Sequence, residues 1–155
     1  MKRIFILITG LISLICLCCC SNSNKEDFYG TYTFKEVSYL SPLSSSTIDY
    51  INQQMAGTKY IIEADLFKIE STDNTVEISS PKYVKEKITK KSGLLSDIHS
   101  IIGNEVLYQY TIYNKDGSKT HWRLYVSSDY IWAAAYSDNT INGSEVIMSI
   151  DKLSK

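Results

Sequence analysis

Short runs of alternating apolar and polar residues fill most of this chain, and they constrain its fold more than any other feature. A period of two places successive side chains on opposite faces of a β-strand. Turn-forming residues separate the runs by only a few positions, which is typical of hairpins in a meander. The runs before the middle of the chain are residues 59–63, 66–70, 75–79 and 83–89. We therefore predict an all-β, antiparallel, up-and-down meander.

The last third of the chain shows this alternation most clearly. One predicted face carries Val106, Tyr108, Tyr110 and Ile112, and the Asn-Lys-Asp-Gly sequence at residues 114–117 is a strong turn signal. Three further strands follow, so we expect eight or nine strands in all. They are predicted at residues 121–127, 130–136 and 145–152, with connections at residues 128–129 and 137–144.

The first strand, predicted at residues 30–39, does not keep its alternation. Tyr32 and Phe34 share one face, but Val37 is out of phase with them. We therefore expect a β-bulge or a strong bend near Lys35. A long strand that bends is typical of barrels.

One or two short helices are expected to interrupt the strands. Ser46 with Asp49 three residues later resembles a capping box that opens a helix ending near Gly57. A second helix is expected at residues 92–102, where apolar residues recur at helical spacing and a glycine follows.

The first twenty residues have the anatomy of a secretory signal. A basic start is followed by an apolar stretch at residues 4–16, shorter than the about 20 residues that a membrane-spanning helix needs. The end of the stretch resembles a bacterial lipobox, with Leu17 three positions before Cys20. We predict a lipoprotein signal peptide at residues 1–19 and acylation of Cys20, palmitate included, which anchors the protein to a membrane. The alternative is an ordinary signal peptide with incidental cysteines.

The positions of the cysteines show that the mature domain cannot contain a disulfide. All four cysteines lie within residues 16–20, so nothing downstream can form a disulfide. The remaining chain of about 135 residues is long enough for one hydrophobic core of ordinary size. We therefore predict a lipidated tether at residues 20–28 and a single domain at residues 29–155.

The charge balance is not that of a nucleic-acid-binding protein. The chain has 16 basic and 17 acidic residues, and removal of Lys2 and Arg3 with the signal leaves 14 against 17. The one basic cluster lies at residues 82–91, where lysines are expected to discourage pairing at a sheet edge. Contact with anionic lipid headgroups is the alternative. No nucleic-acid partner is expected.

The first strand carries a family resemblance. Its start, Gly30-Thr31-Tyr32, resembles the Gly-x-Trp signature of the lipocalin or calycin barrels, and residues 30–67 are similar to small lipocalin-like bacterial lipoproteins of uncharacterised role. The resemblance implies that the meander closes into a barrel of about eight strands, either filled by side chains or holding one small ligand. It also implies that Tyr32 packs against a basic residue of the last strand, for which Lys152 is the candidate.

No motif for catalysis or metal binding stands out in the sequence. It contains two histidines, His99 and His121, and no His-Glu-x-x-His, Gly-x-Ser-x-Gly or paired-cysteine motif outside the signal. Carboxylate pairs, such as Glu63 with Glu70, arise by chance in any meander. We therefore predict a protein that is not an enzyme, without catalytic residues, bound metal or cofactor.

Aromatic residues offer the remaining chemistry, since the chain has 12 tyrosines, 2 tryptophans and 4 phenylalanines. Five rings are predicted to line a cavity on one face of the late strands and to stack on an apolar ligand. The alternative is that these rings are the core. Arg123 is expected on the opposite face, paired in solvent. The five candidate ligand-binding residues are Tyr108, Tyr110, Trp122, Trp132 and Tyr136.

These observations favour a membrane-anchored lipoprotein of the cell envelope, held outside the cytoplasm on the cell membrane or the outer membrane. Its predicted function is non-enzymatic binding of a small hydrophobic ligand or of a protein partner. The alternative is an inhibitor or protein-interaction module that acts through rim loops at residues 40–46 and 137–144. A third class, an envelope hydrolase, would have to rely on His99 or His121.

Overall fold

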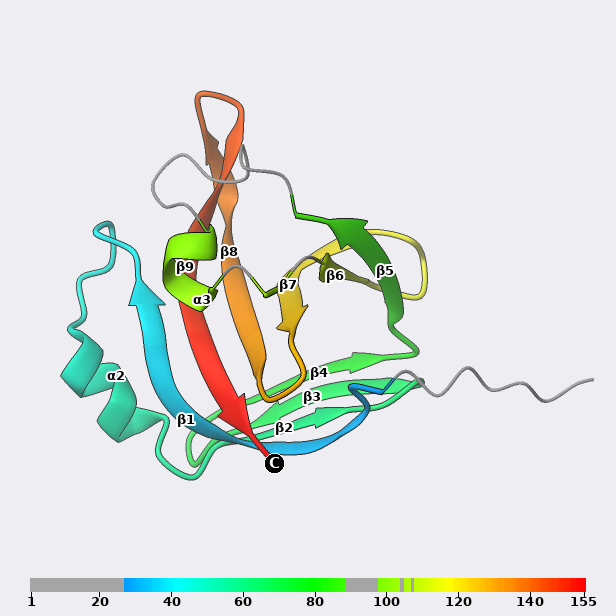
Figure 1. The fold of residues 1–155 in the computed structure, drawn as a ribbon, viewed down its shortest axis with the longest axis horizontal. Coiled ribbons are helices and arrows are strands. Elements are labelled where there is room, and N and C mark those ends of the chain that lie inside the picture. Colours follow the sequence, from blue (N-terminus) through cyan, green and yellow to red (C-terminus); the bar gives the residue numbers. More distant parts are fainter. Residues whose placement is uncertain (1–26, 89–97, 104, 107) are drawn as a thin grey trace, which may run out of the picture.

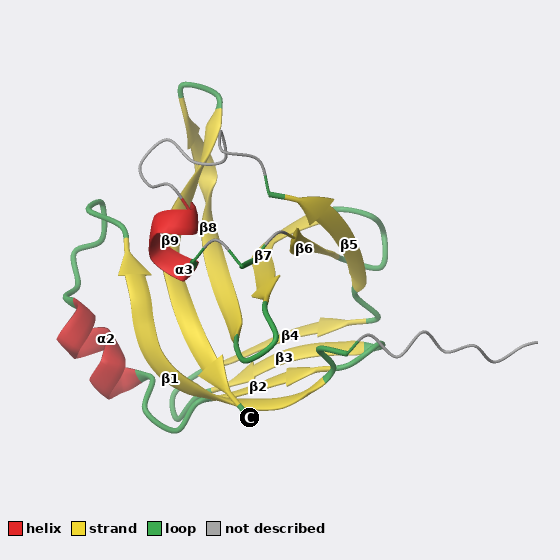
Figure 2. Cartoon of the chain, in the orientation of Figure 1, coloured by secondary structure: helices red, strands yellow, loops and turns green. Residues whose placement is uncertain are grey.

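The computed structural model describes residues 27–88, 98–103, 105–106 and 108–155 of the chain. These residues form one antiparallel β-sheet with two short helices, so the all-β prediction is confirmed (Figures 1 and 2). The strands are β1 (Gly30–Leu40), β2 (Lys59–Ile62), β3 (Leu66–Glu70), β4 (Thr75–Ser79), β5 (Lys82–Lys87), β6 (Tyr108–Tyr113), β7 (Lys119–Val126), β8 (Ile131–Ile141) and β9 (Ser144–Ser154). The helices are α2 (Ile48–Gln54) and α3 (Ile98–Ile102).

The nine strands lie in the order β4-β3-β2-β1-β9-β8-β7-β6-β5. The first strand therefore pairs with the last, as in an up-and-down barrel, and every other pair joins strands that follow each other in the chain. The two edge strands, β4 and β5, are also consecutive in the chain but are not paired with each other. The sheet is not closed into a barrel, so the predicted closure is unconfirmed.

The two edges of the sheet nevertheless meet at one end, because β4 ends at Ser79 and β5 begins at Lys82. Between them Ser80 adopts a φ of 52°, and its backbone N–H donates to the carbonyl of Asp65 at 2.7 Å. The Tyr83 hydroxyl of β5 lies 3.1 Å from the Glu63 carbonyl oxygen, beside the turn between β2 and β3. A tyrosine side chain of edge strand β5 is thus hydrogen-bonded to the β2–β3 turn, next to the end of edge strand β4.

The predicted edge position of the lysine-rich segment is confirmed for its described part, since β5 carries three lysines along a free edge. Charged edge residues disfavour pairing with a second chain. Lys90 and Lys91, the rest of that cluster, lie outside the described residues.

The bulge predicted in the first strand is confirmed. The pairing of β1 with β9 shifts register between Phe34 and Glu36 and again between Val37 and Tyr39. The backbone N–H of Val37 donates to the Asn52 side chain of α2 at 2.8 Å. The helix therefore supplies a hydrogen-bond acceptor where the strand pairing is irregular.

Helix α2 begins one residue later than expected. Its N-cap is Thr47, whose hydroxyl accepts from the Tyr50 backbone N–H at 3.3 Å, rather than Ser46. The hydroxyls are equivalent in chemistry, so the sequence pattern could not choose between neighbouring positions. Ile51 and Met55 pack against the core, whereas Ile48 is exposed.

The larger hydrophobic cluster lies on the inner face of the curled sheet. The rings of Phe67 on β3 and Trp122 on β7 are 5.9 Å apart, although four strands separate β3 from β7 in the sheet order. Only a strongly curved sheet brings them together. The fully buried members at the centre include Tyr60, Ile62, Phe67, Ile112, Leu124 and Leu153.

A second hydrophobic cluster lies on the opposite face of β7, β8 and β9, where α3 packs (Figure 1). Ile98 and Ile102 of α3 are buried against Tyr125, Trp132 and Ile150. The second helix of the sequence prediction is confirmed for residues 98–102, and the rest of its predicted span lies outside the described residues. β8 is therefore covered on both faces.

The prediction of a loop at residues 137–144 is wrong. β8 continues to Ile141 and β9 starts at Ser144, so these residues form the end of a long hairpin. Asn142 and Gly143 have φ values of 50° and 75°, which fit the tight two-residue turn that an Asn-Gly pair favours. The hairpin end projects beyond the rest of the sheet (Figure 1).

A carboxyl group is buried in the inner cluster. Asp151 of β9 is 4% exposed and accepts a hydrogen bond from the Tyr60 hydroxyl at 2.8 Å. Its Oδ1 has no partner among the described residues. Burial therefore raises the pKa of Asp151 to about 6.

The raised pKa predicts how stability depends on pH. Between an unfolded pKa of 3.8 and a folded pKa of about 6, the folded chain binds more protons than the unfolded chain, so this group destabilises the fold as pH rises. Asp151→Asn keeps an acceptor for Tyr60 without the charge. We expect the variant to gain stability over the wild type as pH rises from 4 to 7, by about 2 kcal/mol.

Urea unfolding across that pH range measures the difference, and Asp73→Asn, in an exposed turn, is the control. A stability difference that stays constant with pH would contradict the raised pKa of the buried Asp151.

Candidate functional site

A pocket of about 520 Å³ opens at one end of the curled sheet. It is built by the segment before β1, the C-terminal end of β9, the turn between β7 and β8, and single residues of β5 and β6. The lining residues are Asp27, Phe28, Tyr32, Lys85, Tyr110, Val126, Ser127, Ser128, Asp129, Tyr130, Ile131, Leu153 and Lys155.

Aromatic rings form one wall of the pocket. The rings of Phe28 and Tyr110 lie 4.4 Å apart, and Phe28 also meets Tyr83 edge-on at 5.5 Å. The Tyr32 hydroxyl donates to the Phe28 carbonyl at 2.8 Å, which fixes the segment before β1 against the sheet. Phe28, Tyr32 and Tyr110 are each less than one-tenth exposed. The wall is therefore preformed rather than assembled by a ligand.

The turn between β7 and β8 forms the opposite wall. The Ser127 backbone N–H donates to the Tyr130 carbonyl at 3.0 Å, and its hydroxyl accepts from the Tyr130 backbone N–H at 3.2 Å. Two hydrogen bonds between the same residues hold the turn in a fixed shape. Ser128 and Asp129 are exposed at its tip, where they face the pocket opening.

Two lysines line the same pocket. The Lys85 ammonium lies 4.5 Å from the Tyr108 ring centre and 5.8 Å from that of Tyr110. The Lys155 ammonium lies 5.8 Å from the Tyr32 ring centre. A cation over an aromatic face is stabilised without being neutralised.

The basic partner implied for Tyr32 by the family resemblance is a different residue. Lys152 lies 3.9 Å from the Tyr130 ring centre and 3.8 Å from a carboxylate oxygen of Glu36. Lys155 takes the position over Tyr32 instead, because Thr33 pairs with Ser154 and so places Tyr32 opposite the end of β9.

The five aromatic residues predicted to bind ligand are not brought together. Tyr110 lines the pocket, and Trp122 packs against the inner cluster behind it. Tyr108 is 43% exposed under Lys85. Trp132 and Tyr136 belong to the cluster on the opposite face. The prediction that all five share one face is wrong, because Tyr125 pairs with Trp132 and sets both rings on the outer face.

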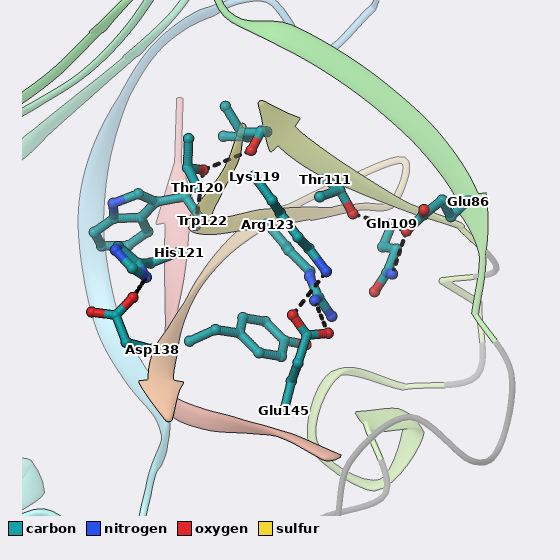
Figure 3. Close-up of polar contacts among 12 residues, drawn as sticks. Glu86, Gln109, Thr111, Lys119, Thr120, His121, Trp122, Arg123, Asp138 and Glu145 are labelled. Atoms are coloured by element: carbon teal, nitrogen blue, oxygen red, sulfur yellow. Dashed lines mark hydrogen bonds and ion pairs between the residues drawn. The ribbon is translucent and has the colours of Figure 1, made fainter. Parts of the chain in front are cut away.

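The expectation that Arg123 pairs in solvent is also wrong. Arg123 does lie on the face opposite Leu124, but it is only 5% exposed and forms an ion pair with Glu145. Its guanidinium lies 3.8 Å from the Tyr136 ring centre. Figure 3 shows the Arg123 side chain running toward Glu145 within a group of polar residues on this face.

The polar group around Arg123 continues across the neighbouring strands. Glu86 on edge strand β5 accepts hydrogen bonds from Gln109 at 2.9 Å and Thr111 at 2.8 Å (Figure 3). These bonds, the one from Gln109 above all, lower the pKa of Glu86 and keep it charged. The group therefore ties β5 to β6 and β7 to β9 by charge-assisted contacts.

Neither histidine belongs to the pocket lining. His121 is half exposed, and its Nδ1 lies 3.0 Å from a carboxylate oxygen of Asp138, which is 80% exposed (Figure 3). His99 lies in α3 with its Nδ1 3.3 Å from the Gly103 carbonyl oxygen.

Of the lining residues, only Tyr110 was among the predicted site residues, and those that were missed include Phe28, Lys85, Tyr130 and Lys155. Phe28 precedes the first strand, Tyr130 lies in a turn and Lys155 follows the last strand, so the alternation within strands gave no signal for them. The adjacent aromatic residues Phe28 and Tyr29, just before Gly30, could have indicated this site. Large apolar rings outside a strand are expected to pack against another part of the protein.

No family model, curated protein or solved structure matches the chain. The resemblance to lipocalin-like lipoproteins therefore stays a prediction. Within the described residues, no helix is long and apolar enough to cross a membrane.

The ion pair of buried Arg123 with the partly exposed Glu145 predicts a stability difference between two variants. Glu145→Ala leaves the buried Arg123 without its carboxylate, and we expect unfolding to become easier by about 2 kcal/mol. Lys119→Ala removes the exposed lysine that contacts the same Glu145 at 2.8 Å, and we expect a loss of about 0.5 kcal/mol. Urea unfolding of both variants checks the ranking. Equal losses would show that burial of Arg123 does not set the strength of the pair.

Proposed function

We propose that this protein is a non-enzymatic, extracytoplasmic lipoprotein that binds a small hydrophobic ligand in the pocket beside Phe28, Tyr32 and Tyr110. The pocket volume of about 520 Å³ carries the proposal, because it falls within the range of small-molecule sites. The preformed aromatic wall supports it, since rings held in place bind a ligand without an ordering cost. Serine and charged side chains around the opening would orient the ligand.

The curled sheet supports the lipocalin-like form of the proposal. We infer that the fold is an up-and-down barrel opened at the single seam between β4 and β5. The strand order has the cyclic sequence that such a barrel requires, and the Tyr83 hydroxyl of β5 donates to the carbonyls of Glu63 and Leu66 at the β2–β3 turn, where Leu66 pairs with Ser79 at the end of β4. The inner face is filled by side chains, so the ligand would bind at the end of the sheet rather than at its centre.

The alternative, a protein-interaction or inhibitor module, is favoured by a different observation. The end of the β8–β9 hairpin projects beyond the sheet, and Leu43 in the loop at residues 40–46 is 58% exposed. Loops of this kind are typical contacts for a protein partner. Absence of any pocket ligand in the experiment below would favour this alternative.

Ligand binding is tested by filling the pocket. Ser128 is exposed at the pocket opening, so Ser128→Trp should block the pocket without disturbing the core. We expect non-covalently bound small molecules to co-purify with the wild-type chain and to be lost from this variant, as read by native mass spectrometry. Asn139→Trp, equally bulky and exposed on the hairpin, should retain them. Co-purified molecules that persist in Ser128→Trp, or that are absent throughout, would contradict the proposal.

The anchor is tested at Cys20, which lies outside the described residues. We expect Cys20→Ser to abolish incorporation of labelled palmitate and to reduce the share of protein that sediments with membranes, because the acyl chains would be missing. Cys16→Ser, a matched change within the signal, should label and sediment normally. Labelling that survives Cys20→Ser would assign the anchor elsewhere.

A further inference from the structure

Each tyrosine of the pocket lining lies within reach of a lysine ammonium. Lys155 lies over Tyr32 and Lys85 over Tyr110, both at 5.8 Å, and Lys152 lies over Tyr130 at 3.9 Å. Lys85 lies on β5, Lys152 lies on β9 and Lys155 directly follows β9. β5 and β9 are not neighbours in the sheet. The curvature of the sheet therefore gathers three lysines around the tyrosines of one pocket.

Two of these lysines make no ion pair among the described residues. Lys152 has Glu36 as a partner, and elsewhere Lys68 and Lys119 pair with glutamates. In the part of the chain that the structure describes, the ammonium groups of Lys85 and Lys155 lie over tyrosine rings and within 4 Å of no carboxylate. A ring face holds an ammonium without using its N–H donors, so both groups retain hydrogen bonds to offer.

The pocket lining also contains two carboxylates, Asp27 and Asp129. Within the described residues no ion pair joins either of them to Lys85 or Lys155. The two ammonium groups are therefore not held in contact by a carboxylate of the lining, and their N–H donors remain available to a ligand of opposite charge.

We propose that the pocket binds an organic acid, with its apolar or aromatic body against Phe28, Tyr32 and Tyr110 and its anionic group at Lys85 and Lys155. This inference rests on the proposed ligand-binding function and specifies the chemical class of the ligand. Charge-assisted hydrogen bonds from the ammonium groups supply the preference for an anion over a neutral molecule of the same shape. The rings supply the preference for an organic acid over an inorganic anion.

Three probes separate the contribution of the lysines to binding from that of the aromatic rings. 2-Naphthoate carries both an aromatic body and a carboxylate, 2-naphthalenemethanol carries the body alone, and inorganic phosphate carries the charge alone. The full chain is reconstituted in phosphatidylcholine nanodiscs, so that no anionic headgroup competes, and empty discs serve as the blank in equilibrium dialysis. We expect naphthoate to bind roughly tenfold more tightly than the alcohol, and phosphate to bind most weakly.

Substitution of the lysines tests the assignment to these residues. In the double variant Lys85→Gln/Lys155→Gln, naphthoate should lose its advantage over the alcohol, while binding of the alcohol should stay within about twofold of the wild type. Lys115→Gln, in the exposed turn after β6, is the matched control and should bind all three probes as the wild type does. A circular dichroism spectrum equal to that of the wild type confirms that the double variant is folded.

The outcomes separate this inference from the proposed function. Equal binding of naphthoate and the alcohol by the wild type would overturn the organic-acid assignment and leave small-ligand binding in place. An advantage for naphthoate that survives in the double variant would overturn the role of Lys85 and Lys155. Phosphate binding as tight as naphthoate binding would overturn the requirement for an apolar body. Binding of none of the probes would count against the proposed function itself.

Discussion

The pairing of β1 with β9 is the contact on which the rest of the structure depends. It is the one strand pair in the described sheet that joins segments far apart in the chain, with Thr33 opposite Ser154. Without it the sheet would separate into two meanders, β1 to β4 and β5 to β9. No cysteine lies beyond Cys20, so the pairing has no disulfide to hold it and relies on the side chains buried along it. The two register shifts in β1 bend the strand, and the bend brings β3 opposite β7.

Buried polar groups make this pairing sensitive to register. Asp151 lies on the inner face of β9 and bonds to Tyr60, whereas Ile150 beside it belongs to the outer cluster. A slip of β9 by one residue would turn Asp151 to the outer face and leave the Tyr60 hydroxyl buried without its acceptor. The burial of a carboxyl group costs free energy. A slipped register would cost more, because it would leave the Tyr60 hydroxyl buried without a hydrogen-bond partner. The Arg123 pair constrains β7 and β9 in the same way on the other face.

The sequence predicted the positions of the strands well, but it predicted less well which face of the sheet each side chain occupies. Alternation located the strands and the bulge near Lys35, because those are local properties of the chain. The run from Ile131 to Tyr136 is apolar throughout because β8 is covered on both faces, so alternation could not show which way Trp132 points. That direction depends on the register of β7 with β8, which is a property of two strands together. The opening between β4 and β5 depends on the curvature of the whole sheet, and no local pattern encodes it.

The proposed anchor at Cys20 would keep the pocket close to the membrane. Asp27 and Phe28 line the pocket, and Asp27 is seven residues from Cys20. A chain of that length reaches at most about 25 Å when fully extended. If Cys20 carries acyl chains, the Asp27 side of the pocket therefore stays within that distance of the membrane surface, whatever path the connecting residues take. An organic acid with an apolar body partitions to the same interface, because its charge stays in water while its body enters the lipid. The anchor would then raise the local concentration of such a ligand at the pocket, which allows modest affinity to suffice.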